Sequence, residues 1–253
     1  MLPQPHRYKI LNIWVDAVTK PEALAFAETI LQQGTRPHAI LAANPEKNYS
    51  VVRDPVLMEA FATADLLLPD GIGIVWAARF LYGVKMARLA GVEFMEELCR
   101  LSAQRGYKIF LYGAKEEVNR RAVEVLRERY PGIQIVGRAH GYLGEADMPQ
   151  LIAAINTSGA EILFLALGSP KQEKWFATYR PALQSVKLVQ GIGGTLDVIT
   201  GAVPRAPASW QRLGVEWLYR LLREPQRLGR QLVLPLFAAE VLAEKFSSLK
   251  QRQ

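Results

Sequence analysis

The chain has 253 residues, half of them hydrophobic, and a formal net charge of +7 at pH 7. Its length fits one large α/β domain or one domain with an appendage, and its single cysteine, Cys99, excludes an internal disulfide framework and a cysteine-based zinc site. We expect a cytosolic protein, because the N-terminus lacks the pattern of a signal peptide and no apolar run is long enough to span a bilayer.

Short apolar runs that suit buried strands alternate with segments of helical periodicity. The predicted strands cover residues 8–15, 38–42, 65–68, 108–112, 134–136, 161–165 and 187–190. The predicted helices cover residues 20–33, 54–63, 74–81, 91–104, 116–129 and 171–179, with a short one after residue 194. This alternation predicts a mostly parallel sheet with helices on both faces.

The pattern changes after Ala202, where prolines separate a set of short helices. We interpret residues 1–202 as the α/β domain and residues 203–253 as a helical appendage. From residue 201 onward there are nine basic and four acidic residues, a surplus of five positive charges. A basic tail of this kind indicates an anionic partner, which is a phosphate group, a membrane surface or a nucleic acid.

Polar or glycine-rich junctions follow four of the predicted strands. They are Asn44, residues 70–73, residues 168–172 and residues 191–195. The carboxyl ends of parallel strands lie along one edge of a sheet, where open α/β folds bind their ligands, so we expect these groups to converge. In the last junction, Gly193, Gly194 and Thr195 present backbone N–H groups at a helix start, and such groups suit a phosphate.

Asp70 lies between a proline that ends a strand and a glycine that precedes a helix. This position suits a reacting carboxylate, and it equally suits a helix N-cap. The other polar residues near the strand ends also have purely structural interpretations: a turn residue for Asn44, a surface residue for Gln172, a loop aromatic for Tyr142, and a helix-stabilising carboxylate for Asp197.

Four arginines of the tail recur at three- and four-residue spacings, which places them close together on a helix. They are Arg220, Arg223, Arg227 and Arg230. Charge at this spacing is usually a solvated face. A planar guanidinium also suits phosphate oxygens, so these side chains could supply the positive charge that a diphosphate leaving group needs in the absence of a metal.

Common cofactor and metal motifs are absent from the sequence. The glycines at 191–194 lack the full spacing of a dinucleotide fingerprint, and there is no Walker A lysine motif. There is also no Asp-x-Asp pair, no His-x-x-x-His motif and no cysteine pair. We therefore expect no cofactor and no bound metal.

Several ordered motifs match a known family. They are NPEK at 44–47, PDGIG at 69–73, RLAG at 88–91, GSPKQEKW at 168–175, GIGGTLD at 191–197, RAP at 205–207, GVEWLYR at 214–220 and EP at 224–225. Together they resemble the WecG/TagA/CpsF family of bacterial glycosyltransferases over nearly the whole chain.

The resemblance implies a Rossmann-like fold and an inverting glycosyltransferase that needs no metal. The expected donor is a UDP-sugar carrying N-acetylmannosamine or a related sugar. The expected acceptor is a sugar on a polyprenyl diphosphate, in the synthesis of a surface polysaccharide or cell-wall polymer. The resemblance further implies that the appendage closes the active site and directs the enzyme to the inner face of the cell membrane as a peripheral protein, and that the chain can form a homo-oligomer.

The resemblance also implies roles for individual residues. Asp70 matches the proposed catalytic base, which deprotonates the acceptor hydroxyl as it attacks the anomeric carbon. The implied substrate-binding residues are Asn44, Arg88 and Gln172 for sugar or phosphate, Tyr142 and Asp197 for uridine, and Arg220, Arg227 and Arg230 for the diphosphate. One departure from the family pattern is Ala42, where members often carry a hydroxyl residue.

Two other functions stay open at this point. A nucleotide-dependent oxidoreductase would suit the predicted sheet, although the dinucleotide fingerprint is absent. A non-catalytic protein that binds nucleic acid through its basic tail would suit the charge, although no recognition-helix or stacking-aromatic motif supports it.

Overall fold

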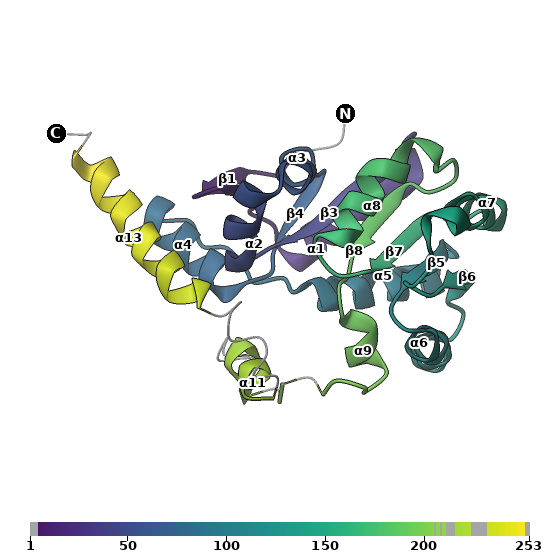
Figure 1. Ribbon diagram of the computed structural model, residues 1–253. Helices are drawn as coiled ribbons and strands as arrows, with labels where there is room; N and C mark the ends of the chain where they lie inside the picture. The colour runs from purple at the N-terminus through teal and green to yellow at the C-terminus, as the bar shows by residue number, and fades with distance from the viewer. Residues whose placement is uncertain (1–4, 205, 208, 211–215, 224–231, 251–253) are drawn as a thin grey trace.

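A six-stranded parallel sheet forms the centre of the molecule (Figure 1). The computed structural model describes residues 5–204, 206–207, 209–210, 216–223 and 232–250. The strand order is β4-β3-β8-β7-β5-β6. The strands are β3 (His38–Ala43), β4 (Leu66–Pro69), β5 (Lys108–Gly113), β6 (Gln134–Ala139), β7 (Ile162–Ala166) and β8 (Leu188–Gly191). The predicted parallel α/β sheet is confirmed.

Helices cover both faces of this sheet (Figure 1). One face packs on α1 (Lys20–Gln33), α5 (Gly91–Arg105), α6 (Glu116–Arg129) and α9 (Thr195–Ile199). The other face packs on α3 (Pro55–Ala62), α4 (Ile72–Tyr82), α7 (Met148–Ser158) and α8 (Lys171–Tyr179). Alternate residues of each strand enter opposite cores, as Ile40 and Leu41 do in β3, because successive side chains of a strand point to opposite faces. Cys99 is a fully buried core residue of α5, as predicted.

Local capping explains where several helices begin. Thr19 forms a capping box with Glu22 at the start of α1. Asn44 caps α2 (Pro45–Ser50) by accepting from the Lys47 amide, and Asp54 caps α3 by accepting from the Leu57 amide. The helix predicted from the Asp54-Pro55 pair therefore begins where the sequence indicates.

The segment predicted as a first strand at residues 8–15 is a hairpin instead, so that prediction was wrong. Its strands are β1 (Arg7–Ile10) and β2 (Ile13–Asp16), which pair antiparallel in a separate two-stranded sheet. The chain reverses because Leu11 adopts a φ of 53°, and the next residue, Asn12, donates its backbone N–H to Asn48 Oδ1 at 2.8 Å. The contact with Asn48 therefore stabilises a turn that interrupts the apolar run.

The C-terminal segment contains α11 (Glu216–Arg223) and α13 (Val233–Lys250). Helix α13 lies along α4, and its Phe237 and Val241 are buried in the same apolar cluster as Ile74 (Figure 1). Helix α13 also contacts α2, where Tyr49 Oη donates to Glu240 Oε2 at 3.0 Å. Part of the predicted appendage is thus packed on the α/β domain. Across the described ranges, no helix combines the length and the apolarity that crossing a bilayer requires.

Candidate active site

A cavity of about 820 Å³ lies where the carboxyl ends of the strands meet α4, α9 and the C-terminal helices. The four junctions predicted to converge all contribute to its lining. The predicted site residues that line it are Asn44, Asp70, Arg88, Gln172, Gly193, Gly194 and Asp197. The rule that parallel strand ends share one edge therefore brings together side chains that are more than 150 residues apart in sequence.

Asp70 is held by the start of another helix. Its Oδ1 accepts a hydrogen bond from the Gly91 amide, the first residue of α5, at 3.2 Å. Its own amide donates to Ala43 O at 3.1 Å and to Leu68 O at 2.8 Å, which fixes the backbone at the end of β4. The N-cap of α4 is Gly71, and no side chain caps that helix. The interpretation of Asp70 as the cap of the helix that follows it is therefore wrong.

Gln172 holds the glycine loop that follows β8. It is only 6% exposed, and its Oε1 accepts from the Gly193 amide at 3.0 Å. A Cβ atom on Gly191 would lie 2.3 Å from Gln172 Nε2, so any larger residue there would displace the Gln172 carboxamide from its present position. The interpretation of Gln172 as a plain surface residue is wrong, because the side chain is buried against this loop.

This contact changes what the loop can offer an anion. The Gly193 N–H is engaged by Gln172, and the Thr195 N–H donates to Ile192 O at 3.1 Å. The Gly194 N–H makes no hydrogen bond within the part of the chain that the structure describes. Of the N–H groups expected to bind phosphate, that of Gly194 is therefore the one available.

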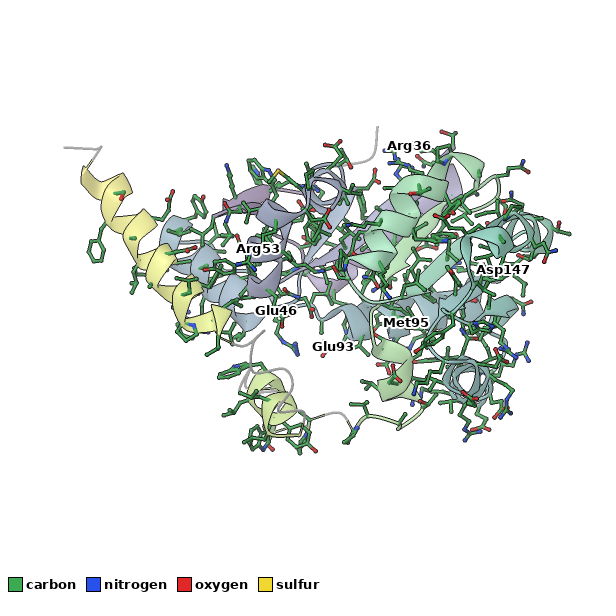
Figure 2. All side chains as sticks on the ribbon, viewed as in Figure 1. Arg36, Glu46, Arg53, Glu93, Met95 and Asp147 are labelled. Carbon is green, nitrogen blue, oxygen red and sulfur yellow. The ribbon has the colours of Figure 1, made fainter. Side chains whose placement is uncertain are left out.

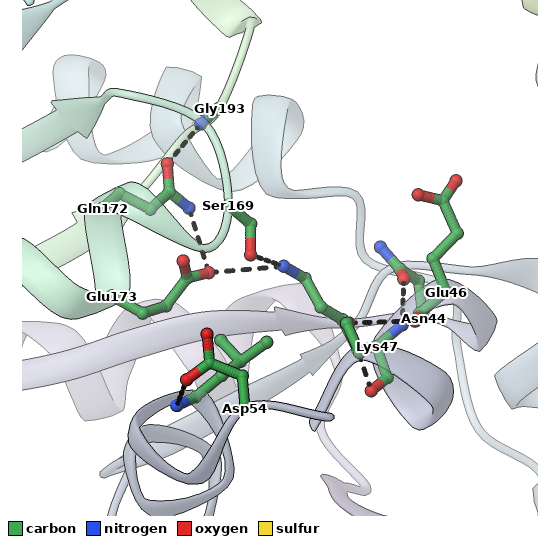
Figure 3. Close-up of polar contacts among 10 residues, drawn as sticks. Asn44, Glu46, Lys47, Asp54, Ser169, Gln172, Glu173 and Gly193 are labelled. Carbon is green, nitrogen blue, oxygen red and sulfur yellow. Dashed lines mark hydrogen bonds and ion pairs between the residues drawn. The ribbon is translucent and has the colours of Figure 1, made fainter. Parts of the chain in front are cut away.

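A buried ion pair connects α2 to α8 at the cavity wall (Figure 3). Lys47 Nζ lies 3.4 Å from Glu173 Oε1 and also contacts the Ser169 hydroxyl. The side chains are 13% and 2% exposed, and Glu173 Oε2 has no hydrogen-bond partner among the described residues. Neither residue is among the site residues predicted from the sequence. Their positions within the strand-end motifs at 44–47 and 168–175 are the signal that could have indicated them.

Three further predicted residues line the cavity in different environments. Asn44 Oδ1 accepts from the Lys47 amide at 3.1 Å, so this residue is a helix cap as well as a lining residue. Arg88 Nη2 lies 3.6 Å from Glu93 Oε1. Asp197 lies in the first turn of α9.

Tyr142 and the arginines of the tail are placed differently. Tyr142 is 71% exposed in the connection between β6 and α7, and it does not belong to the cavity lining. Arg220 lies in α11, but the structure does not describe its side chain. Arg227 and Arg230 lie outside the described residues.

The described lining of the cavity carries more carboxylates than cations. The cations are Lys47 and Arg88, and the carboxylates are Glu46, Asp70, Glu173 and Asp197. Each cation already lies near a carboxylate: Lys47 near that of Glu173, and Arg88 near that of Glu93. Figure 2 shows Glu46 and Glu93 on the side of the domain that faces α11. An anionic ligand therefore needs positive charge from elsewhere. The described residues contain no group of three His, Cys, Asp or Glu side chains that could hold a metal ion.

Comparison with known proteins identifies the family. The model of the glycosyl transferase WecG/TagA/CpsF family matches residues 8–251. The chain belongs to this family. The resemblance seen in the ordered motifs is thus confirmed, and the protein is a glycosyltransferase.

Two curated relatives carry the same name, N-acetylglucosaminyldiphosphoundecaprenol N-acetyl-beta-D-mannosaminyltransferase. The protein from Bacillus subtilis (strain 168) is 35% identical over 206 residues, which cover 81% of this chain and 79% of the relative. The protein from Bacillus spizizenii strain W23 is 34% identical over 211 residues, which cover 83% of this chain and 81% of the relative.

The cavity of this glycosyltransferase has two unlike sides. The strand ends supply the polar side described above. The opposite side is apolar, and its lining residues on α4, α11 and α13 include Trp76, Phe80, Trp217, Phe237 and Leu242. Of these, Trp76 is 65% exposed and Phe80 is 42% exposed, so the apolar side continues onto the surface. The cavity therefore suits a ligand that has both a polar and an apolar part.

Proposed function

We propose that this glycosyltransferase moves N-acetylmannosamine or a related sugar from a UDP-sugar to a sugar carried on a polyprenyl diphosphate. The observation that carries the proposal is the position of Asp70, on the lining of a cavity whose one side is polar and whose other side is apolar. The names of the two Bacillus relatives state a mannosaminyl transfer to a lipid-diphosphate sugar, which supports the same substrates here.

In the proposed reaction, the Asp70 carboxylate takes the proton of the acceptor hydroxyl while that oxygen attacks the anomeric carbon of the donor. The new glycosidic bond forms on the face opposite UDP, the bond to the diphosphate oxygen breaks, and the configuration inverts. A carboxylate within hydrogen-bond reach of the hydroxyl can supply this general base catalysis. The contact with the Gly91 amide supports this role, because it holds the carboxylate in one orientation.

The donor diphosphate needs positive charge as UDP leaves. The described lining has more carboxylates than cations, so we assign this task to Arg220, Arg227 and Arg230 of the appendage. Guanidinium groups match phosphate oxygens in bidentate geometry, which would make the reaction independent of a metal ion. On the donor side, the Gly194 N–H is assigned to a phosphate and Asp197 to the uridine, whereas Tyr142 lies outside the cavity lining and is given no role.

The remaining lining residues are assigned to sugar recognition. Asn44 and Arg88 lie on the same cavity as Asp70, and Gln172 orders the loop that carries Gly194. The exposed apolar side of α4 and α13 is assigned to the first isoprene units of the acceptor. We therefore propose that the enzyme works as a peripheral protein at the inner face of the membrane, with residues 203–253 as the segment that closes over the substrates.

A direct assay tests the proposal. The full-length protein is incubated with UDP-N-acetylmannosamine and an N-acetylglucosaminyl diphosphate lipid, with and without EDTA, and the product is identified by mass spectrometry and NMR. We expect a disaccharide lipid of inverted configuration in both arms. UDP-N-acetylglucosamine and UDP-N-acetylmannosaminuronic acid, tested in parallel, define the sugar. Absence of transfer from all three donors would refute the proposal, and loss of transfer with EDTA would refute its metal independence.

A further inference from the structure

We infer that Gln190 is a positioning residue for Asp70. Gln190 lies in β8, is 1% exposed and does not belong to the cavity lining, so it cannot touch a substrate bound there. Its influence on the reaction therefore has to pass through another residue. This inference rests on the proposed role of Asp70 as the base.

Gly91 connects Gln190 to Asp70. Gln190 Nε2 donates to Gly91 O at 2.8 Å, and the Gly91 amide donates to Asp70 Oδ1 at 3.2 Å. The two hydrogen bonds use the carbonyl and the N–H of a single residue, so the position of Gly91 is set by one partner and transmitted to the other. The side chain from β8 thereby fixes a contact made at the end of β4, although β3 lies between these two strands in the sheet.

The segment before α5 is held by the Leu89 amide, which donates to Pro69 O at 2.9 Å, but the N-cap of the helix makes no side-chain hydrogen bond. Ala90 is the N-cap and has no side chain that could accept a hydrogen bond from the first turn. Gly91 itself adds no side-chain packing, and a Cβ there would lie 3.7 Å from the Ala42 Cβ. Gln190 thus provides a fixed point that neither a cap nor a side chain at residue 91 supplies.

The buried carboxamide of Gln190 lowers the stability of the core, which indicates that it has another role. Its Oε1 is buried and has no hydrogen-bond partner among the described residues. An unsatisfied buried polar atom is destabilising, and an apolar side chain of the same size would avoid that penalty. The carboxamide is therefore explained by the bond that its Nε2 makes to Gly91, rather than by core stability.

Kinetics of Gln190→Leu test the inference. Displacements of about 1 Å in an active site cost on the order of 100-fold in rate, so we expect kcat to fall about 10- to 100-fold. KM for the UDP-sugar should stay unchanged, because Gln190 does not contact the cavity. Gln190→Met, which also lacks the donor but keeps an unbranched chain, carries the same expectation should Gln190→Leu not fold. An unchanged kcat in a folded variant would overturn the inference.

Asn119→Leu is the matched control. Asn119 is a fully buried carboxamide whose Nδ2 donates to Gly113 O at 2.8 Å and to Ala139 O at 3.0 Å, and whose Oδ1 lacks a partner among the described residues. None of the residues it binds lines the cavity. We expect Asn119→Leu to change thermal stability but not kcat. An equal fall in kcat for both variants would show that any buried carboxamide has this effect, which would overturn the inference.

An NMR readout keeps the inference separate from the proposed reaction. The amide resonance of Gly91 should shift on Asp70→Ala in the wild-type background, and this shift should shrink when Gln190→Leu is also present. The result does not depend on transfer activity. A Gly91 shift that is the same in both backgrounds would overturn the inference, even if the protein transfers sugar. Reduced coupling in a protein that proves unable to transfer sugar would support the positioning while refuting the proposed function.

Discussion

The carboxylate of Asp70 accepts a hydrogen bond from the Gly91 amide at 3.2 Å, so the residue that directly follows β4 is held by the residue that begins α5. An aspartate between proline and glycine would ordinarily cap the next helix. Here the side chain turns to a different helix and lines the cavity. The contact gives the carboxylate a fixed orientation before any substrate binds, which is the condition for an efficient general base.

The hydrogen bond from the Gly193 amide to Gln172 predicts that two unlike substitutions weaken binding of the UDP-sugar in the same way. Gln172→Leu removes the acceptor for the Gly193 amide, and Gly191→Ala places a methyl group where the Gln172 carboxamide now lies. We expect both to raise KM for the UDP-sugar, because the loop that carries Gly194 loses its support. Gly144→Ala is the control, since its Cβ would meet no atom closer than 3.7 Å. Steady-state kinetics check the prediction. A KM for the UDP-sugar that neither substitution changes would show that the Gln172–Gly193 contact does not support the loop.

The Lys47–Glu173 pair predicts a strong non-additivity in stability. Lys47→Met leaves the buried carboxylate uncompensated, which typically costs about 3–5 kcal/mol, whereas the double variant Lys47→Met with Glu173→Gln should recover most of this loss. Urea unfolding of the single and double variants measures the coupling. The exposed pair of Arg120 and Glu124 is the comparison, where Arg120→Met should cost less than about 1 kcal/mol. Simple additivity at Lys47 and Glu173 is the result that this account does not permit.

The contact between α2 and α13 predicts a loss of stability at alkaline pH. Burial, followed by the hydrogen bond to Glu240, raises the pKa of Tyr49 above its usual value. The folded state thus favours the neutral phenol, so the contribution is fully present below the unfolded pKa of about 10 and is lost as the pH rises through the folded pKa. Urea midpoints should fall more steeply between pH 8 and about 11 for the wild type than for Tyr49→Phe. Parallel curves for the two proteins would mean that this contact does not stabilise α13.

The apolar side of the cavity predicts that substitutions there affect lipid acceptors selectively. Trp76→Ser and Phe80→Ser should raise KM for an acceptor with a long prenyl chain and leave KM for the UDP-sugar unchanged, because both side chains line the cavity on the α4 side. The control is Trp14→Ser, since Trp14 is 40% exposed but does not line the cavity. The measurement compares long-chain and short-chain acceptors. An equal rise in KM for both acceptors would show that the prenyl chain does not bind at this side of the cavity.

Much of the fold could be predicted because its determinants are local. Helix α3 begins at the Asp54-Pro55 pair, and α6 follows its apolar periodicity from Glu116 to Arg129. The hairpin at the N-terminus escaped prediction because its turn depends on a contact between Asn12 and Asn48, which are 36 residues apart. Helix α7 was not predicted at all, although Pro149 stands at one of its first positions, where proline is favoured.

The candidate site divides in the same way. Strand-end residues such as Asp70 could be predicted to converge, because a parallel sheet brings the ends of its strands to one edge. The partners of those residues could not. The pairing of Lys47 with Glu173 joins residues 126 positions apart, and hydrogen bonds to Gly91 connect Gln190 to Asp70. Such contacts depend on how helices pack on the sheet, which no local pattern records.

The central claim is that the Asp70 carboxylate is the base, and kinetics of Asp70→Asn test it most directly. Asparagine keeps an oxygen that can accept from the Gly91 amide, so the fold and the binding of the UDP-sugar should be retained, but it cannot take up the acceptor proton. We expect kcat to fall about 10²- to 10⁴-fold, with little change in thermal stability or in donor affinity. Turnover by Asp70→Asn at the wild-type rate would contradict the account.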